Sequence, residues 1–139
     1  MRRSIVAATI LYSSTVLAVQ ADSHAASTQE VVMSHLKAIG ALDVDAAVSD
    51  YAEDASIITP DGVYTGPDEV RAYYETLIEE FSQPDISMET QTLVFEGKTG
   101  FLVWTGESPD NVYEYAADTY VVEDGEIVSQ TFAAKITPK

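Results

Sequence analysis

The stretch DTYVVEDGEIVSQTF, residues 118–132, decides the fold of this chain. Two runs of β-branched and aromatic residues flank Asp124 and Gly125, and Asp-Gly in such a setting is a strong signal for a two-residue hairpin loop. The same alternation continues upstream, and it predicts strands at about residues 86–95, 99–106, 112–122 and 126–137. The C-terminal part of the chain is therefore expected to form an antiparallel meander.

A helical period precedes this meander, and the change of period after Pro84 is the main architectural signal. Asp43 is a predicted N-cap, and Pro67 is typical of the first turn of a helix. The expected elements are helices over residues 27–39, 43–51 and 67–81 and short strands over residues 56–59 and 63–65. The predicted fold class is α+β, with three N-terminal helices packed in the concave face of a curved, mainly antiparallel sheet.

The last hairpin also predicts which residues share a face of the sheet. If Asp124 and Gly125 form the loop, strict alternation places Asp118 opposite Thr131 and Thr119 opposite Gln130, and it pairs Glu114 with Lys135. The helices of one chain can cover only one face, so the other apolar face needs a partner. We expect a homodimer packed sheet to sheet through Tyr113, Tyr115, Val121, Val128 and Phe132. The alternative is an aromatic surface that is tolerated in water.

The first residues have the pattern of an export signal. Arg2 and Arg3 precede a largely apolar run over residues 5–19, and Val19-Gln20-Ala21 fits the small-residue rule for cleavage. The run is short for a bilayer span, which needs about 20 apolar residues. We therefore expect a signal peptide over residues 1–21, a single domain over residues 22–139, a periplasmic or secreted location, and no stable membrane insertion after cleavage.

Composition limits the possible partners and the possible chemistry. The chain has 23 acidic and 7 basic residues, and 2 of the basic ones lie in the expected signal peptide. Binding of nucleic acid needs clustered Lys and Arg, so such a partner is not expected. The two histidines lack metal-ligand spacing, and no nucleophile, phosphate-loop or dinucleotide motif occurs. We expect neither a metal nor another cofactor.

Asp118 is the residue that most suggests chemistry. It interrupts the apolar stretch AADTYVV, residues 116–122, on the face assigned to the helices. A carboxyl group that is desolvated there has a raised pKa and can act as a general acid or base. A structural role, in which Asp118 accepts hydrogen bonds that hold the hairpin in register, is equally open.

Several motifs together resemble a known family. They are the string YAEDA at residues 51–55, the Asp61-Gly62 turn, Thr65-Gly66-Pro67 before the third helix, and the closing pattern DTYVVEDGEI. This arrangement resembles the SnoaL-like branch of the nuclear transport factor 2-like superfamily, and the resemblance covers essentially all of residues 22–139. The superfamily includes ketosteroid isomerases, polyketide cyclases, epoxide hydrolases, dehydratases and non-catalytic binding domains, so it indicates a fold and leaves the activity open.

The resemblance implies a cone-shaped roll with a cavity between the helices and the concave sheet face. Its expected lining residues are Tyr51, Asp54, Tyr64, Tyr74, Trp104, Asp118 and Tyr120, with Asp118 and Tyr120 as candidates for catalysis. The hydrolase branch uses an Asp–Arg–Asp set, whereas the internal arginine here, Arg71, begins the third helix. This difference argues against epoxide hydrolysis.

Two functions of different class remain open. One is an exported binding domain whose aromatic cavity holds an apolar or aromatic small molecule without changing it. The other is a cofactor-independent isomerase, cyclase or dehydratase that acts on a small carbonyl compound, with Asp118 as general acid or base. The sequence lacks a complete catalytic set, and this favours the binding domain.

Overall fold

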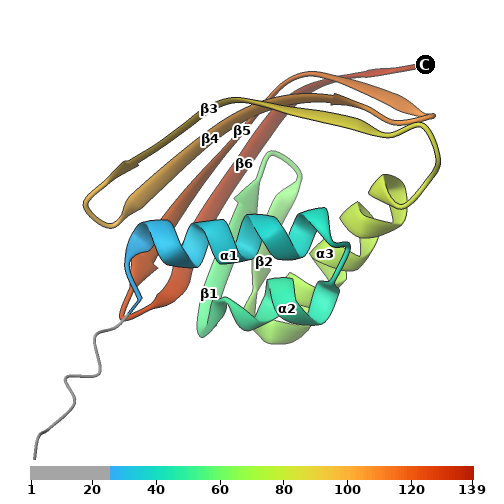
Figure 1. Ribbon diagram of the computed structural model, residues 1–139. Coiled ribbons are helices and arrows are strands. Elements are labelled where there is room, and N and C mark those ends of the chain that lie inside the picture. The colour runs from blue at the N-terminus through green and yellow to red at the C-terminus, as the bar shows by residue number, and fades with distance from the viewer. Residues whose placement is uncertain (1–25) are drawn as a thin grey trace, which may run out of the picture.

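The computed structural model describes residues 26–139, and the expected signal peptide lies outside this range. Its elements are α1 (Thr28–Gly40), α2 (Val44–Ser49), β1 (Tyr51–Thr59), β2 (Gly62–Thr65), α3 (Gly66–Phe81), β3 (Ser87–Glu96), β4 (Thr99–Glu107), β5 (Asn111–Glu123) and β6 (Glu126–Pro138). The strands form one sheet in the order β2-β1-β6-β5-β4-β3, in which only the β1–β6 pair is parallel. The long strands arch over the helices, and α1 lies across the hollow of the sheet (Figure 1). The predicted α+β architecture is confirmed.

Local sequence signals start the helices as expected. Ser27 caps α1 and forms a capping box with Glu30, so two backbone N–H groups at the helix start are satisfied. The side chain of Asp43 accepts a hydrogen bond of 3.0 Å from the Ala46 backbone N–H at the start of α2. Pro67 lies in the first turn of α3. No helix within residues 26–139 is long and apolar enough to cross a membrane.

The predicted end of the second helix is wrong. The helical spacing of apolar residues suggested a helix to Tyr51, but α2 ends at Ser49 and Tyr51 begins β1. Tyr51 pairs in parallel with Ile127 of β6, and the Ile127 backbone N–H donates to the Asp50 carbonyl at 2.8 Å. Pairing with a strand that is distant in sequence therefore overrides the local helical pattern.

Two β-bulges change the predicted register of the last hairpin. Glu123 pairs with Glu126 as expected, but Val128 is an extra residue in β6, so Asp118 lies opposite Phe132 and Gln130 opposite Tyr120. The predicted opposition of Asp118 to Thr131 is wrong for this reason. A second extra residue, Glu114, interrupts β5, although its carboxylate still forms the expected ion pair with Lys135. Each bulge reverses the face of the residues beyond it, because side chains alternate along a strand.

The bulges move two residues of the expected dimer face into the core. Phe132 stacks on Trp104 at a ring-centroid distance of 6.4 Å, and Tyr113 is only 4% exposed beside Phe81 and Trp104. The prediction that both residues face a partner is therefore wrong. Tyr115 remains exposed on the outer side.

Close strand packing near the cavity depends on Gly106. A Cβ atom at this position would lie 2.7 Å from the Ser87 carbonyl oxygen of the neighbouring strand. Backbone cannot yield easily, so we expect Gly106→Ala to lower the free energy of unfolding by about 1–3 kcal/mol. Gly62→Ala is a matched control, because no atom lies within 4 Å of its added methyl group. Urea unfolding of the two variants tests this, and equal stabilities would contradict the packing argument.

Candidate functional site

A cavity lies between the concave sheet face, α1 and α3. Its lining is mostly aromatic and aliphatic, and consists of His35, Leu36, Ile39, Tyr73, Tyr74, Leu77, Phe81, Met88, Leu102, Trp104, Asp118, Tyr120, Gln130 and Phe132. The enclosed volume is about 50 Å³, small beside the roughly 300–1,000 Å³ of typical ligand pockets. We call this space the inner cavity. It can hold the polar end of a ligand but little more.

Asp118 is the ionisable acid in the wall of the inner cavity. It lies on β5 and is 6% exposed. Trp104 Nε1–H of β4 donates to its Oδ2 at 2.9 Å, and Gln130 Nε2–H of β6 donates to its Oδ1 at 2.8 Å. Both neighbouring strands thus fix the carboxyl plane, and each oxygen keeps a further lone-pair site for a ligand.

Burial controls the protonation of Asp118. Loss of water raises the pKa of its carboxyl group to about 6, although the hydrogen bonds from Trp104 and Gln130 act in the opposite direction. No cationic side chain lines the cavity to stabilise the carboxylate. Asp118 therefore exchanges a proton close to neutral pH, as a general acid or base requires.

Gln130 connects Asp118 to a buried group of phenols. The Tyr51 hydroxyl donates to Gln130 Oε1. The Tyr74 hydroxyl oxygen lies 2.9 Å from the same amide oxygen and 2.5 Å from the Tyr51 hydroxyl oxygen. An amide oxygen accepts and an amide nitrogen donates, so these phenols hold the oxygen on their side and turn the NH₂ group toward Asp118. The orientation of Gln130 is thereby fixed.

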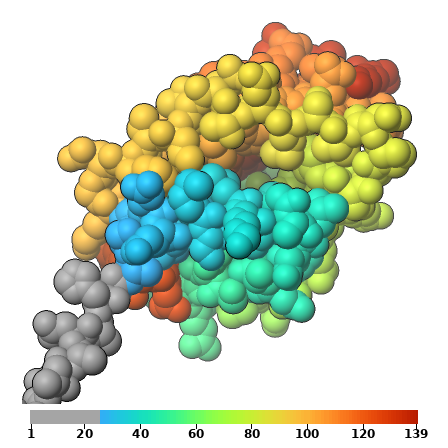
Figure 2. All heavy atoms as spheres, viewed as in Figure 1, coloured from blue at the N-terminus to red at the C-terminus, as the bar shows by residue number. Residues whose placement is uncertain are grey.

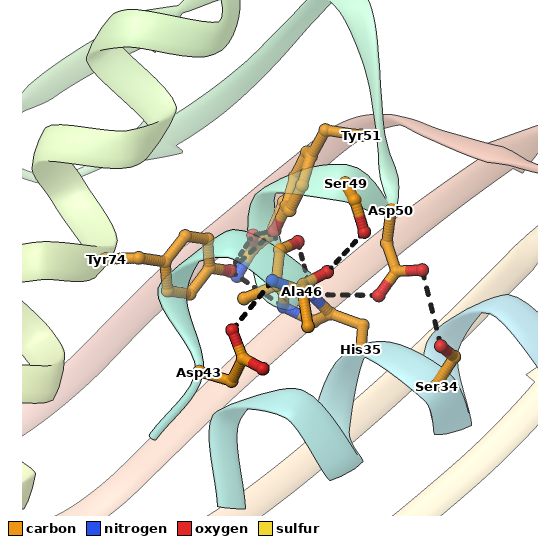
Figure 3. Close-up of polar contacts among 10 residues, drawn as sticks. Ser34, His35, Asp43, Ala46, Ser49, Asp50, Tyr51 and Tyr74 are labelled. Atoms are coloured by element: carbon orange, nitrogen blue, oxygen red, sulfur yellow. Dashed lines mark hydrogen bonds and ion pairs between the residues drawn. The ribbon is translucent and has the colours of Figure 1, made fainter. Parts of the chain in front are cut away.

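His35 completes this network from α1. Its ring is fully buried, and Nδ1 lies 3.2 Å from the Ala47 carbonyl oxygen, which can only accept a hydrogen bond. Nδ1 therefore carries the proton, and Nε2 accepts from the Tyr74 hydroxyl at 2.9 Å (Figure 3). Burial lowers the pKa of His35 to about 4, although the bond to Ala47 raises it. The imidazole is thus neutral at pH 7, and the Asp50 carboxylate 3.9 Å from Nδ1 makes no ion pair with it at that pH.

Two other hydroxyl groups remain available to a ligand. Tyr73 and Tyr120 line the inner cavity, and neither hydroxyl has a hydrogen-bond partner among residues 26–139. No side-chain polar atom in this range is both fully enclosed and unpartnered, so both hydroxyl oxygens keep some accessible surface. Burial raises the pKa of both phenols well above the usual value, and the charge of Asp118 adds to this. They therefore remain protonated donors.

The structure separates the predicted lining residues into three groups. Asp118, Tyr120, Tyr74 and Trp104 line the inner cavity as expected. Tyr51 lies behind the wall and acts through its hydrogen bond to Gln130.

The other two expected lining residues lie outside the inner cavity. Tyr64 lines an outer groove beside Tyr73, with the two ring centroids 5.1 Å apart. Asp54 is exposed on β1, because the segment expected to end a helix is a strand whose Ala55 and Ile57 face the core instead. The prediction that Asp54 contributes to the cavity is wrong.

Three residues of the site were not predicted. His35 has helical spacing from Val31, Val32 and Ile39, and a histidine within such an apolar stripe is a signal for a buried polar network. Gln130 was interpreted as a partner of Thr119, because the bulge at Val128 leaves no mark in the sequence. Tyr73 has helical spacing from Val70, Leu77 and Phe81, and such an aromatic residue is typical of a helix packed on a core, so its sequence context gives no sign of a site. Among the described residues, no group of three or more His, Asp or Glu side chains is arranged to hold a metal ion.

The pKa of Asp118 predicts a pH dependence of stability. The unfolded chain loses this proton near pH 4 and the folded chain near pH 6, so the folded state binds more protons between these values. This group therefore lowers the free energy of unfolding by about 2–2.5 kcal/mol as the pH rises from 4 to 7. The stability of Asp118→Asn relative to the parent protein should rise by this amount over the same range, as measured by urea unfolding.

The exposed Asp54 provides the control for this measurement. Asp54→Asn removes a carboxylate of the same type without changing a buried one. Measured in the same way, it separates the effect of the buried carboxyl group from that of removing an exposed one. A constant difference for Asp118→Asn would show that Asp118 titrates as it does in water.

Comparison with known proteins agrees with this geometry. The family model described as "SnoaL-like domain" matches residues 32–130. A comparison with curated protein sequences finds no match. Similar solved structures include SalBIII, an epoxide hydrolase/cyclase-like enzyme with a role in pyran ring formation in the polyether salinomycin. It has 20% identity and a TM-score of 0.67, over 81% of this chain and 95% of that one.

Two further structures have the same fold. An NTF2-like protein of unknown function from Cytophaga hutchinsonii has 18% identity and a TM-score of 0.63, over 82% of this chain and 94% of that one. A cystatin-fold protein from Novosphingobium aromaticivorans has 19% identity and a TM-score of 0.65, over 78% and 98%. At these identities the likeness establishes the fold alone. Because the family model matches most of the described residues, the chain belongs to the SnoaL-like domain family.

Proposed function

We propose that this protein is a cofactor-independent enzyme that moves a proton on a small, largely apolar carbonyl compound, with Asp118 as the general base. The observation that carries this proposal is the set of three groups left available in the inner cavity. They are the desolvated Asp118 carboxyl and the unpartnered hydroxyls of Tyr73 and Tyr120. An acid–base group beside two neutral donors is the combination that enolisation of a ketone needs.

The proposed step uses these groups as follows. The Asp118 carboxylate takes a proton from the carbon next to the carbonyl group. The electron pair of that C–H bond forms the C=C bond of an enolate, and the π electron pair of the carbonyl group moves to its oxygen. The hydroxyls of Tyr120 and Tyr73 donate hydrogen bonds to the resulting oxyanion. Protonated Asp118 then returns the proton to carbon. Trp104 and Gln130 position the carboxyl group throughout, and the inner cavity limits access of water.

A non-catalytic binding domain is the second candidate, and one observation favours it. His35, Tyr51, Tyr74 and Gln130 satisfy one another in a closed hydrogen-bond network, as structural polar clusters do. In this case Asp118 would orient a ligand without exchanging a proton with it. SalBIII has a role in pyran ring formation, and this supports a catalytic use of the fold without extending that reaction to this chain.

Deuterium exchange distinguishes the two candidates. We expect the protein to exchange the α-protons of 2-butanone in D₂O faster than buffer does, with a rate that rises with pH through about 6 as Asp118 ionises. Asp118→Asn should lower this rate by about 10²–10⁴-fold, the usual contribution of a general base. Proton NMR follows the loss of the α-proton signals.

Controls separate chemistry from folding. Asp54→Asn should catalyse exchange of the 2-butanone α-protons at the rate of the parent protein. Circular dichroism should confirm that Asp118→Asn is folded. Tyr120→Phe should slow exchange while leaving its pH midpoint in place. Saturable binding of 2-butanone without accelerated exchange would reject the enzyme and support the binding domain.

We also propose that the protein is an exported homodimer. The apolar run and cleavage pattern of residues 1–21 support export. For the dimer, the support is an uncharged area on the outer face of β3–β6, in a chain with a net charge of −16. By strand alternation this area, here called the outer patch, contains Val94, Phe101, Val103, Ala117, Thr119, Val121, Thr131 and Ala133. A second copy of such an acidic chain could approach this face without meeting like charges.

A charge in the outer patch should separate the subunits. Thr119→Arg places a cation at the centre of the outer patch, where a dimer would have to bury two of them. We expect it to convert a dimer into a monomer in sedimentation velocity, whereas Thr76→Arg, on the exposed side of α3, should not. A monomeric parent protein would reject the dimer outright.

A further inference from the structure

A second hollow adjoins the inner cavity at the C-terminal ends of α1 and α3. It is lined by Ile39, Gly40, Leu42, Leu77, Ile78, Phe81, Ile86 and Met88 and has a volume of about 270 Å³. Ile39, Leu77, Phe81 and Met88 also line the inner cavity, so the two spaces share a wall. Figure 2 shows a hollow between the cyan atoms of α1 and the yellow atoms of β3. We call the second space the apolar mouth.

The charge pattern of the apolar mouth is unusual for this molecule. None of its lining residues is charged, although 22% of the chain is Asp, Glu, Lys or Arg. The outer groove near Tyr64 differs, because Asp61 contributes to its wall. Leu42 and Met88 remain 41% and 49% exposed at the rim of the apolar mouth. The inner cavity therefore shares a wall with an uncharged hollow, whereas the outer groove has an acidic wall.

The backbone of Leu42 is a second, independent observation. Its φ of 57° lies in the left-handed region, which costs a non-glycine residue about 1–2 kcal/mol. The position follows the last turn of α1, where glycine or asparagine is usual. A leucine thus lies at a place where it strains the backbone and exposes apolar surface. Its side chain forms part of the rim of the apolar mouth, and strain of this kind is concentrated at ligand sites.

We infer that the apolar mouth is a binding subsite for the hydrocarbon tail of a neutral ligand whose oxygen lies against Asp118, Tyr73 and Tyr120. The inference rests on the proposed function for the position of the oxygen. The inner cavity of about 50 Å³ holds only that polar end, so the rest of the ligand must lie in an adjoining space. The apolar mouth fits a chain or ring of a few carbon atoms.

The same residues exclude anionic ligands. No Lys or Arg lines the inner cavity or the apolar mouth, and Asp118 carries negative charge above pH 6. A fatty acid would bring a second carboxylate to that acid without a cation to compensate it. The expected ligand class is therefore an uncharged ketone, aldehyde or lactone with an apolar tail.

Trp104 provides the readout for a test. It is the single tryptophan of the chain, and its indole N–H is bonded to Asp118 in the inner cavity. Titration of the whole protein with 2-octanone at pH 8 should change this fluorescence in a saturable way, whereas octanoate should not. An equal response to octanoate, or none to 2-octanone, would overturn the inference.

Leu42→Gly separates binding from stability. Glycine relieves the left-handed backbone, so the midpoint of thermal unfolding should not fall. The affinity for 2-octanone should nevertheless fall by about fivefold, because tail contacts are lost. Asp124→Gly relieves a similar φ of 50° at the β5–β6 turn and should leave affinity unchanged. Unchanged affinity in Leu42→Gly would place the tail elsewhere.

A charge at the rim tests the same subsite from the strand side. Met88→Glu should lower the affinity for 2-octanone by about tenfold, since the hydrocarbon tail would displace water from the new carboxylate. Met33→Glu is the matched control, because Met33 is 47% exposed on α1 and lines none of the spaces described above. A change of oligomeric state in Met88→Glu without a loss of affinity would mark the mouth as a protein contact and reject the subsite.

The short ketone distinguishes this inference from the proposed function. Exchange of 2-butanone should change less in Leu42→Gly than the affinity for 2-octanone does, since the chain of 2-butanone is four carbon atoms shorter. If Asp118-dependent exchange of 2-butanone persists while both rim variants bind 2-octanone normally, the subsite fails and the proposed function stands. If 2-octanone binds as expected but no exchange occurs, the enzyme fails and the subsite stands.

Discussion

The hydrogen bond from Gln130 to Asp118 is the interaction on which the site depends. It joins two adjacent strands and ties the carboxyl plane to the phenols of Tyr51 and Tyr74, and through Tyr74 to His35. Groups from α1, β1, α3, β4, β5 and β6 are therefore linked through one amide. Because the amide has distinct donor and acceptor ends, its orientation determines that Asp118 accepts a hydrogen bond from Gln130 and that Tyr51 donates one to it. A buried network of this kind specifies one arrangement of the core.

The network also places two titratable groups, Asp118 and His35, at the centre of the fold, and burial shifts their pKa values in opposite directions. Burial favours the neutral forms of both, which raises the pKa of Asp118 to about 6 and lowers that of His35 to about 4. As the pH rises between these values, the free energy of unfolding falls because of Asp118 and rises because of His35. The two effects therefore largely offset each other. An acid that is useful for proton transfer can thus be buried with little net pH dependence of stability from this pair.

The distribution of charge complements this arrangement. The chain is strongly acidic, yet the outer patch and the walls of the apolar mouth carry no charged side chain. The Glu80 carboxylate, at the end of α3, has a structural role. It accepts hydrogen bonds from Ser108, Asn111 and Tyr113, and so fastens the end of α3 to the strands that carry Trp104 and Asp118.

The sequence by itself determined the order of elements, the hairpin at Asp124-Gly125, the helix caps, the family and the inward direction of Asp118, because these depend on local periodicity and turn chemistry. Only the tertiary structure decided the bulges at Val128 and Glu114, the end of α2 and the partners of Asp118. A bulge adds one residue without leaving a pattern in the sequence. The bulge at Val128 turns Gln130 and Phe132 from the outer face to the cavity side, and the bulge at Glu114 does the same for Tyr113. The parallel pairing of Tyr51 with Ile127 joins residues far apart in the chain, so no local pattern contains it. Local periodicity and turn chemistry therefore determine that Asp118 points inward, whereas long-range strand pairing brings Trp104 and Gln130 to its carboxyl group.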